Sequence, residues 1–430
     1  MGKSYYISTF GCQMNVHESE KLAGLLSVRG YFEALSPEKA DVIVFNTCCI
    51  RETAETRIAG RLGNLKRIKE ENPRVILAVC GCMTQKKGGA EALIKRFPYI
   101  DIIFGTHNLT QFGAYLDAYE GKKTVEIWEK ETPGEEDGTA VKRAGTVNAW
   151  VNIMYGCNNF CSYCIVPYVR GRERSRKKAD ILADMRGLLD EGYKEITLLG
   201  QNVNSYGEPG GFSGLLADAA ALSGTFKLKF MTSHPKDLTE DVVRVMAMSD
   251  KLAAHIHLPV QSGSDRVLSL MNRKYTGKKY LETIDMIRKY LPNAGLSSDV
   301  MVGFPTETEA DFLDTVRLVE TVRFSNLFTF IYSRRSGTPA ADMAQIPYKV
   351  KQERIARLIA RQKEIGPALA GEAVGRVFTV LCEEIHGGVA RGKTQCEREM
   401  TFPADGVKPG DFVRVRALRH KNTGLIGELV

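Results

Sequence analysis

Short apolar runs alternate with helical patterns along most of this chain, and this alternation restricts its fold more than any other feature. Helical patterns occupy Glu18–Leu26, Glu52–Ile68 and Ala90–Lys95 in the first 120 residues. Around them lie four runs typical of buried parallel strands, namely Tyr5–Phe10, Asp41–Phe45, Val75–Cys80 and Asp101–Phe104. This order predicts an α/β domain with a doubly wound parallel sheet, which binds ligands at the carboxyl ends of its strands.

A second series of strand-like runs follows between about residues 147 and 365, with helical patterns such as Lys178–Glu191 and Lys278–Tyr290 between them. Its six runs are Ala149–Met154, Glu195–Leu199, Leu228–Thr232, His255–Val260, Gly295–Val302 and Asn326–Tyr332. Six β-α units predict a partial (β/α)6 barrel, whose active site lies at the C-terminal ends of the strands.

The last part of the chain changes character to short strands separated by Gly- or Asp-containing turns. The runs are Arg376–Cys382, Glu399–Phe402, Asp411–Arg416 and Leu425–Val430. They predict a small all-β barrel. We therefore expect a first domain over residues 1–120, a linker over 121–144, a central domain over 145–368 and a terminal barrel over 369–430.

Composition and charge add limits on location and partners. The 430 residues carry a net charge of +8, a mild bias toward a polyanionic partner. The N-terminus has no apolar export signal, and no apolar stretch approaches the ~20 residues that span a bilayer. We expect a cytoplasmic protein with no membrane partner. In that reducing compartment, ten cysteines favour metal binding or catalysis over disulfides.

Cys157, Cys161 and Cys164 form the strongest motif of the sequence, directly after the first strand of the predicted central barrel. The C-x3-C-x2-C spacing places three thiolates on one tight loop. Such a loop can hold a four-iron cluster at three irons and leave the fourth open, as a catalytic metal requires. The alternative is structural zinc, which needs a fourth Cys or His, and none lies within the next turn or two.

Cys12, Cys48 and Cys82 form a second group in the first domain. Each follows the end of a predicted strand. Because the carboxyl ends of parallel strands meet at one edge of a sheet, we expect these three cysteines to lie at the same edge.

At the C-x3-C-x2-C motif, where Tyr163 precedes the last cysteine, the chain resembles the radical S-adenosylmethionine superfamily. Further motifs are similar to those of the methylthiotransferases and cover almost the whole chain, namely Thr9–Asn15, Asn46–Cys48, Gly81–Met83, Gly200–Val203, Thr232–Pro235, His257–Gly263 and Tyr332–Pro339. Gln13-Met14 after the first cysteine resembles the MiaB type, which acts on isopentenyladenosine beside the tRNA anticodon. The last part is similar to a TRAM domain, a small barrel that binds RNA.

The resemblance implies two 4Fe-4S clusters and S-adenosylmethionine as cofactors. The C-x3-C-x2-C cysteines would hold the cluster that chelates S-adenosylmethionine, and Cys12, Cys48 and Cys82 an auxiliary cluster with its own open iron. One S-adenosylmethionine methylates a sulfur, and another generates the radical that removes hydrogen from carbon 2 of the adenine. The expected partners are a tRNA carrying isopentenyladenosine, an electron donor such as flavodoxin or ferredoxin, and a sulfur or cluster donor.

Seven residues at the strand ends of the central domain are candidates for binding S-adenosylmethionine. They are Gly200, Gln201, Ser233, His234, Gln261, Asp299 and Gly303. In the superfamily the position of Gly200-Gln201 holds the methionyl amine, and the others could face the adenosyl group. Each polar residue could equally be a satisfied side chain at the mouth of a barrel. Gly303 permits close approach of the backbone to the adenine.

The four remaining cysteines favour a structural role. Cys49 and Cys80 are neighbours of predicted ligands, and neighbours on a strand point to opposite faces. Cys382 and Cys396 lie in the tail and match no ligand position. Whether Cys49 can replace Cys48 stays open, although the Asn-Thr-Cys motif favours Cys48.

A basic run from Arg170 to Lys178 follows the cysteine loop, and we predict that it contacts RNA phosphates rather than forming only a solvated face. Base chemistry requires an unstacked nucleotide, which a single-stranded loop provides. The candidates are Arg170, Arg172, Arg174 and Arg176, with Arg391, Lys393, Arg398, Arg416 and Lys421 in the tail.

Two other functions remain open at this point. The same chemistry could act on a ribosomal protein or on another modified adenosine, although Gln13-Met14 fits neither branch. A non-catalytic iron–sulfur protein that binds RNA would need the cysteines, but it would not need a pocket for S-adenosylmethionine.

Overall fold

The computed structural model describes residues 2–49, 52–130 and 138–430, with only the backbone of 52–56. Contacts between Cα atoms divide it into two compact units. The first comprises Met1–Ala144, Tyr155–Asn158 and Cys164–Arg174, and the second comprises Gly145–Met154, Asn159–Tyr163 and Ser175–Val430. The second unit therefore joins the predicted central domain and the terminal barrel.

The first unit contains a six-stranded, wholly parallel sheet in the order β2-β1-β3-β4-β5-β6. Its strands are β1 (Ser4–Thr9), β2 (Phe32–Glu33), β3 (Val42–Thr47), β4 (Ile76–Gly81), β5 (Ile102–Phe104) and β6 (Thr124–Glu126). The helices are α1 (Gln13–Val28), α2 (Glu52–Glu71), α3 (Cys82–Gln85), α4 (Gly89–Arg96), α5 (Phe112–Asp117) and α6 (Val166–Val169), with 3-10 turns η1 (Pro37–Lys39) and η2 (Leu109–Gln111).

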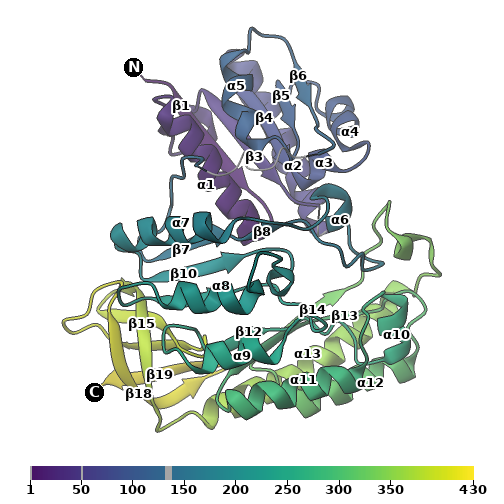
Figure 1. Cartoon of the computed structure of the whole chain (residues 1–430). Coiled ribbons are helices and arrows are strands. Elements are labelled where there is room, and N and C mark those ends of the chain that lie inside the picture. The colour runs from purple at the N-terminus through teal and green to yellow at the C-terminus, as the bar shows by residue number, and fades with distance from the viewer. Residues whose placement is uncertain (1, 50–51, 131–137) are drawn as a thin grey trace. The chain divides into compact units, whose positions relative to one another are not determined.

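Both faces of this sheet are covered by helices because its strands are apolar on both sides (Figure 1). In β3, Val42 and Val44 pack with residues of α1 and α5, whereas Ile43 and Phe45 pack with residues of α2 and α4. The four predicted strands correspond to β1, β3, β4 and β5. The edge strands β2 and β6 were not predicted, since both lack a buried apolar run: both residues of β2 and two of the three residues of β6 are exposed. Strand β6 lies inside the region predicted as a linker, so the sheet extends beyond residue 120.

The central part of the second unit has all six predicted strands, arranged as two three-stranded parallel sheets in the orders β11-β10-β7 and β12-β13-β14. The strands are β7 (Asn148–Asn152), β10 (Glu195–Leu199), β11 (Lys227–Phe230), β12 (His255–His257), β13 (Gly295–Val302) and β14 (Asn326–Ile331). A parallel bridge between Leu228 and Leu252 lies between the two sheets. Strand β12 is shorter than predicted, because Pro259 cannot donate to a ladder and Gln261 has a φ of 67°.

Helices of the second unit cover the outer side of these sheets (Figure 1). They are α7 (Lys178–Asp190), α8 (Gly211–Ala220), α9 (Glu240–Ala247), α10 (Asp265–Leu270), α11 (Gly277–Tyr290), α12 (Glu309–Val322) and α13 (Tyr348–Gly371), with η3 (Val203–Ser205) and η4 (Pro339–Asp342). Side chains cap three helix N-termini, at Ser264, Thr276 and Thr308. The short strands β8 (Met154–Tyr155) and β9 (Arg174–Ser175) pair with each other.

The C-terminal strands form a closed five-stranded barrel in the order β15-β16-β17-β19-β18. They are β15 (Val377–His386), β16 (Val389–Thr394), β17 (Glu399–Pro403), β18 (Phe412–Lys421) and β19 (Gly424–Leu429). The four predicted strands are present, and β16 is an additional one. Cys382 is fully buried in the barrel core, which agrees with the predicted structural role.

The turn between β16 and β17 packs against the N-terminal ends of the central strands. A Cβ on Gly295, the first residue of β13, would lie 2.3 Å from the carbonyl oxygen of Cys396. Glu397 accepts hydrogen bonds from Lys227 at 2.6 Å and from Lys229 at 2.9 Å, both on β11. Glu195 at the start of β10 pairs with the same two lysines. The terminal barrel is thus tied to the central sheets by a network of largely buried charges and by the backbone contact at Cys396.

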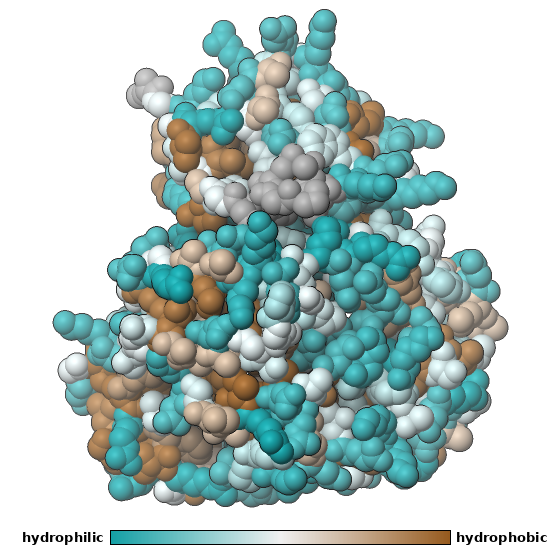
Figure 2. All heavy atoms as spheres, viewed as in Figure 1, coloured by the Kyte–Doolittle hydropathy of each residue, from teal (hydrophilic) through white to brown (hydrophobic). Residues whose placement is uncertain are grey.

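In the part of the chain that the structure describes, no helix is long and apolar enough to cross a membrane. The face in Figure 2 has hydrophilic and hydrophobic areas interspersed, with brown gathering over the terminal barrel. Val377, Val389 and Leu418 are among the exposed hydrophobic residues of this barrel.

Candidate metal centres and cofactor site

Cys12, Cys48 and Cys82 follow three adjacent strands of the first unit, β1, β3 and β4. Cys12 precedes α1, Cys48 follows β3 directly, and Cys82 is the first residue of α3. Gly11 has a φ of 120°, and a Cβ there would lie 2.8 Å from Cβ of Cys48. Only glycine therefore lets the β1 end approach Cys48 so closely. The predicted meeting of the three cysteines at one sheet edge is confirmed.

The surroundings of Cys82 at this edge favour its thiolate. A hydrogen bond with Cys49 lowers the pKa of Cys82 to about 7, with burial opposing and the cation of Arg170 assisting. Arg170 is buried beside α1, donating to Glu18 at 3.1 Å and to Asn15 at 3.0 Å. Burial raises the pKa of Cys80, which lies in the sheet core. A cluster of thiolate ligands needs such a counter-charge, so the first unit's residues fit an auxiliary iron–sulfur group.

The position of Cys49 corrects one expectation. Strand β3 ends at Thr47, so the alternation of a strand no longer applies to the next two residues. Cys49 packs with Cys82, Ile165 and Val169 in a small buried cluster, so it lies on the same side as a predicted ligand and not on the opposite face. The choice of Cys48 over Cys49 as ligand stays a prediction.

The C-x3-C-x2-C loop follows β8. Cys157 and Cys164 belong to segments of the first unit, and Cys161 belongs to the second. The backbone N–H of Cys157 donates to the carbonyl of Gly171 at 3.2 Å. Within the described ranges, no three Cys, His, Asp or Glu side chains have the geometry of a metal site. The ligand assignments of both trios therefore remain predictions.

The middle of this loop is anchored to the segment after α10. Ser162 donates its backbone N–H to the carbonyl of Met271 at 3.0 Å and its hydroxyl to that of Leu270 at 2.7 Å. Asn272, with a φ of 60°, donates to the carbonyls of Asn159 and Phe160 at 3.2 and 2.9 Å. Cys161 is thus held by a second-unit segment that sequence reasoning did not single out.

The predicted cofactor-binding residues follow the carboxyl ends of β10 to β13, except Asp299, which lies within β13. Gly200 and Gln201 follow β10, and Ser233 and His234 follow β11. Among the described residues, Ser233 Oγ and His234 Nε2 are buried and have no hydrogen-bond partner. Burial, assisted by the charges of Arg273 and Lys236, lowers the pKa of His234 to about 2, so its ring is neutral. Two unsatisfied buried polar atoms at one sheet edge fit a polar ligand such as S-adenosylmethionine.

Gln261 and Asp299 are less clearly available to a ligand. The backbone N–H of Gln261 donates to the carbonyl of Asp299 at 2.8 Å. The carboxylate of Asp299 lies 3.7 Å from Nε2 of His257. These contacts explain how the strand ends are held together without assigning a cofactor contact to either side chain.

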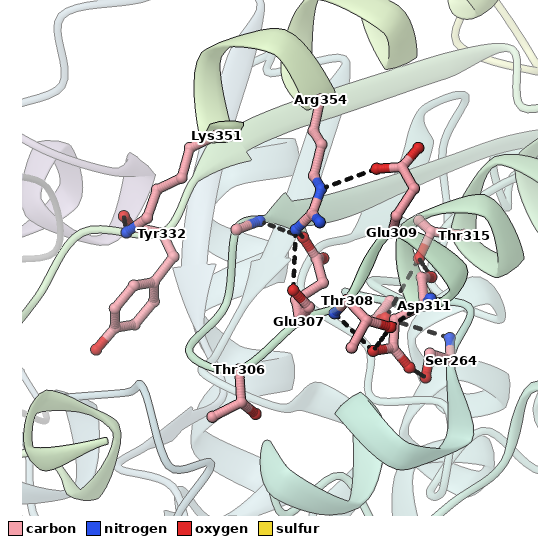
Figure 3. Close-up of polar contacts among 12 residues, drawn as sticks. Ser264, Thr306, Glu307, Thr308, Glu309, Asp311, Thr315, Tyr332, Lys351 and Arg354 are labelled. Carbon is pink, nitrogen blue, oxygen red and sulfur yellow. Dashed lines mark hydrogen bonds and ion pairs between the residues drawn. The ribbon is translucent and has the colours of Figure 1, made fainter. Parts of the chain in front are cut away.

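The loop after β13 is shaped by residues that were not predicted (Figure 3). Gly303 has a φ of 70°, and a Cβ there would lie 2.4 Å from the aliphatic chain of Lys351. Its N–H donates to Glu307 at 2.8 Å, and Arg354 from α13 binds the same carboxylate at 2.7 Å. Lys351 donates to the carbonyl of Tyr332 at 3.3 Å. The positive φ and the packing against Lys351 therefore require glycine at this position.

The basic run divides into buried and exposed arginines. The structure argues against the predicted RNA contact of Arg170, because its guanidinium is buried and paired with Glu18. Arg176 is paired with Asp184 at 2.9 Å and its side chain is 11% exposed. Arg174 donates to the carbonyls of Arg170 and Arg172. Arg172 and Lys177 are the exposed cations of the run.

The cations predicted on the terminal barrel also have partners. Arg391 pairs with Glu384 and Glu399, and Lys393 pairs with Glu383. Arg398 donates to the carbonyl of Leu369 at the end of α13, which is a structural contact. Arg416 pairs with Glu428, and Lys421 is exposed at the end of β18. Arg414 and Arg419 on β18 are exposed and form no ion pair among the described residues.

Comparisons with known proteins agree with these features. Residues 4–105 match an uncharacterized protein family called UPF0004, and residues 151–319 match the radical SAM superfamily. The radical S-adenosylmethionine methyltransferase TsrM from Kitasatospora setae has a similar fold, with a TM-score of 0.58 and 12% identity, covering 79% of this chain and 74% of that one.

Curated relatives match along the full length. A tRNA-2-methylthio-N(6)-dimethylallyladenosine synthase from Clostridium botulinum is 49% identical over 439 residues, covering 99% of this chain and 95% of the relative. A synthase of the same name from Clostridium perfringens is 47% identical, covering 100% of this chain and 98% of the relative. The chain therefore belongs to the family of tRNA-2-methylthio-N(6)-dimethylallyladenosine synthases, which are methylthiotransferases of the radical S-adenosylmethionine type.

Proposed function

We propose that this protein adds a methylthio group to carbon 2 of N(6)-isopentenyladenosine beside the anticodon of tRNA. The observation that carries the proposal is the full-length similarity to synthases of this name. Two separate cysteine trios at strand ends support it, because one group must cleave S-adenosylmethionine and another must present sulfur. A ribosomal protein or another modified adenosine as acceptor has no comparable support.

The chain's own residues would bind and orient the cofactors. Cys157, Cys161 and Cys164 would hold one 4Fe-4S cluster, and the trio after β1, β3 and β4 would hold the other. When bound, the clusters and S-adenosylmethionine supply the one-electron chemistry, the methyl group and the sulfur site.

The strand ends of the second unit would bind S-adenosylmethionine. The buried Ser233 hydroxyl and the Nε2 atom of neutral His234 offer two hydrogen-bonding groups to it. The backbone at Gly200-Gln201 would hold its amino group. Gly303 is held in place by Glu307 and would lie beside the adenine without a side chain between them.

The RNA partner would be positioned by cations of both units. Arg172 and Arg174 follow the cysteine loop, and the barrel presents Arg391, Lys393, Arg414 and Arg419. Phosphate contacts of this kind position a substrate without reading its bases. We also propose an electron donor such as flavodoxin or ferredoxin and a sulfur or cluster donor, because the reaction consumes electrons and sulfur. A tRNA substrate fits a cytoplasmic location.

The proposal is tested by anaerobic reconstitution with iron and sulfide, followed by incubation with S-adenosylmethionine, a reductant and tRNA. The tRNA comes from cells that lack this methylthiotransferase, and its nucleosides are analysed by mass spectrometry. We expect the methylthio derivative of isopentenyladenosine only. A tRNA without the isopentenyl group is the control. Modification of threonylcarbamoyladenosine or of a ribosomal protein instead would refute the proposed acceptor.

A further inference from the structure

Arg273 is a buried arginine in the second unit, and it lies next to a cysteine of the C-x3-C-x2-C loop. Its residue is 4% exposed. One guanidinium nitrogen, Nη1, lies 3.6 Å from Sγ of Cys161. Nη2 donates to the carbonyl of Pro259 at 2.6 Å, and Nε donates to the hydroxyl of Tyr275 at 3.0 Å.

The partners of Arg273 do not neutralise its charge. Burial raises the pKa of Tyr275, so the hydroxyl stays protonated, and it donates in turn to the carbonyl of Val260 at 2.8 Å. Among the described residues, no carboxylate forms an ion pair with Arg273. Arginine does not lose its proton in proteins, and buried cations are ordinarily paired with an anion.

Two other buried arginines show the ordinary arrangement in the same chain. Arg170 is bound by Glu18, and Arg354 is bound by Glu307. All three arginines are equally buried, with exposures of 4 to 5%. Arg273 differs from both because the titratable groups beside it are the thiol of Cys161 and the phenols of Tyr163 and Tyr275, and not a carboxylate. Arg273 is therefore a buried cation beside Sγ of Cys161, with no carboxylate partner among the described residues.

We propose that Arg273 is a positioning residue for the radical cluster: its fixed charge against Cys161 favours the reduced cluster and so raises its reduction potential. The inference rests on the proposed function, because it requires a cluster at this loop. An added electron makes the cluster more negative, and a nearby cation stabilises that state. For a separation of about 6 Å between the guanidinium and the added electron, and an effective dielectric constant of about 20, Coulomb's law gives a change of about 100-fold in the ratio of reduced to oxidised cluster.

The backbone around Arg273 holds the guanidinium in this place. Asn272 and Lys274, on either side of it, have φ values of 60° and 58°. The backbone N–H of Arg273 donates to the carbonyl of Leu268 at 2.9 Å. Asn272 also donates hydrogen bonds to the cysteine loop. The charge and these hydrogen bonds therefore come from adjacent residues, and substitution of one residue at a time separates their effects.

The test is a redox titration of the full chain, reconstituted with iron and sulfide, with the reduced cluster followed by electron paramagnetic resonance. The chain carries Cys12→Ala, Cys48→Ala and Cys82→Ala, so that one cluster remains. Arg273→Met removes the charge, Arg273→Lys keeps it, and Asn272→Gly removes only the neutral hydrogen bonds while keeping a backbone that tolerates positive φ.

We expect Arg273→Met to lower the ratio of reduced to oxidised cluster at the wild-type midpoint at least ten-fold, which is about 59 mV for a one-electron couple. Arg273→Lys should stay near the wild type. Asn272→Gly should lose iron more readily without a shift in potential. An Arg273→Met protein that binds a full cluster at unchanged potential overturns the inference. So does weaker binding of S-adenosylmethionine with unchanged potential, which would assign the cation to the cofactor carboxylate.

The outcome also separates this inference from the proposed function. If the C-x3-C-x2-C loop holds no cluster in any variant, the proposed function fails. If the cluster forms and cleaves S-adenosylmethionine while its potential does not depend on Arg273, only the inference fails.

Discussion

Replacing Glu397 with Gln is expected to destabilise the whole second unit, although this residue lies on a turn of the terminal barrel. Its carboxylate, with a side chain 12% exposed, binds the two lysines of β11. Lys227 is 1% exposed, as is Glu195, the other carboxylate of the network. The substitution leaves two cations facing one anion in a buried place.

The magnitude follows from the proton affinity of Glu397. Burial by itself raises the pKa of this carboxyl, but the charges and hydrogen bonds of Lys227 and Lys229 lower it from 4.5 to about 2. A difference of this size corresponds to about 3 kcal/mol of stability at neutral pH. It agrees with the cost of about 3–5 kcal/mol for removing one partner from a buried ion pair.

The stabilisation by the Glu397 carboxylate should decrease as the pH falls. A carboxyl whose pKa is lower in the folded state stabilises the fold fully above about pH 4.5, and this contribution disappears as the pH falls toward 2. The stability difference between the wild type and Glu397→Gln should therefore be largest near neutral pH and shrink on acidification. Other carboxyl groups titrate in both proteins, so the difference isolates Glu397.

The assay is anaerobic denaturant unfolding followed by tryptophan fluorescence. The chain has two tryptophans, and Trp128→Phe leaves Trp150 on β7 of the second unit as the reporter. Glu399→Gln, two residues further on, is the matched control, because Glu399 is 55% exposed and its pair with Arg391 lies in solvent. A Glu397→Gln midpoint equal to that of the control, at every pH, would refute the reasoning.

Three further predictions concern the clusters and RNA. Replacing either cysteine trio with alanine should halve the iron, but only loss of the C-x3-C-x2-C trio should abolish formation of 5′-deoxyadenosine; equal loss in both variants would contradict the division of roles. Cys48→Ala should lose the auxiliary iron and Cys49→Ala should keep it, as iron analysis will show, and the reverse result would make Cys49 the ligand. Arg414→Ala with Arg419→Ala should weaken tRNA binding and flatten its salt dependence by about one to two charges, whereas an unchanged slope would place the RNA elsewhere.

A deletion of the terminal barrel is a poor test of RNA binding, although the sequence predicts this barrel as a separate RNA-binding domain. Removing residues from Gly371 onward also removes Glu397 and exposes Lys227 and Lys229 beside Glu195. Loss of activity would then report damage to the central strands rather than loss of RNA. Substitutions of Arg414 and Arg419 on β18 avoid this because both are exposed and neither belongs to that network.

The strands that carry the sites were predictable because they are apolar on both faces. Strands β10 and β13 have the predicted bounds, and the three cysteines of the first unit follow their strands as expected. Strands at sheet edges, such as β2 and β6, were missed because they are largely exposed and contain no apolar run, whereas the equally short β5 is fully buried. Edge strands need less apolar character, since one side has no partner strand.

The roles of charged residues were the hardest to predict, because the sequence does not show whether a cation faces solvent or pairs with a buried carboxylate. Arg170 was grouped with its basic neighbours, yet its partner Glu18 lies 152 residues away in sequence. Arg273 forms no ion pair with any of the described carboxylates, so the sequence offers no charged partner for it. Thiolates that bind a cluster bring negative charge into a buried place, however, so each trio needs a cation near it. A basic residue close to a predicted cysteine site in the fold is therefore first a candidate counter-charge, and a candidate RNA contact only if it is exposed.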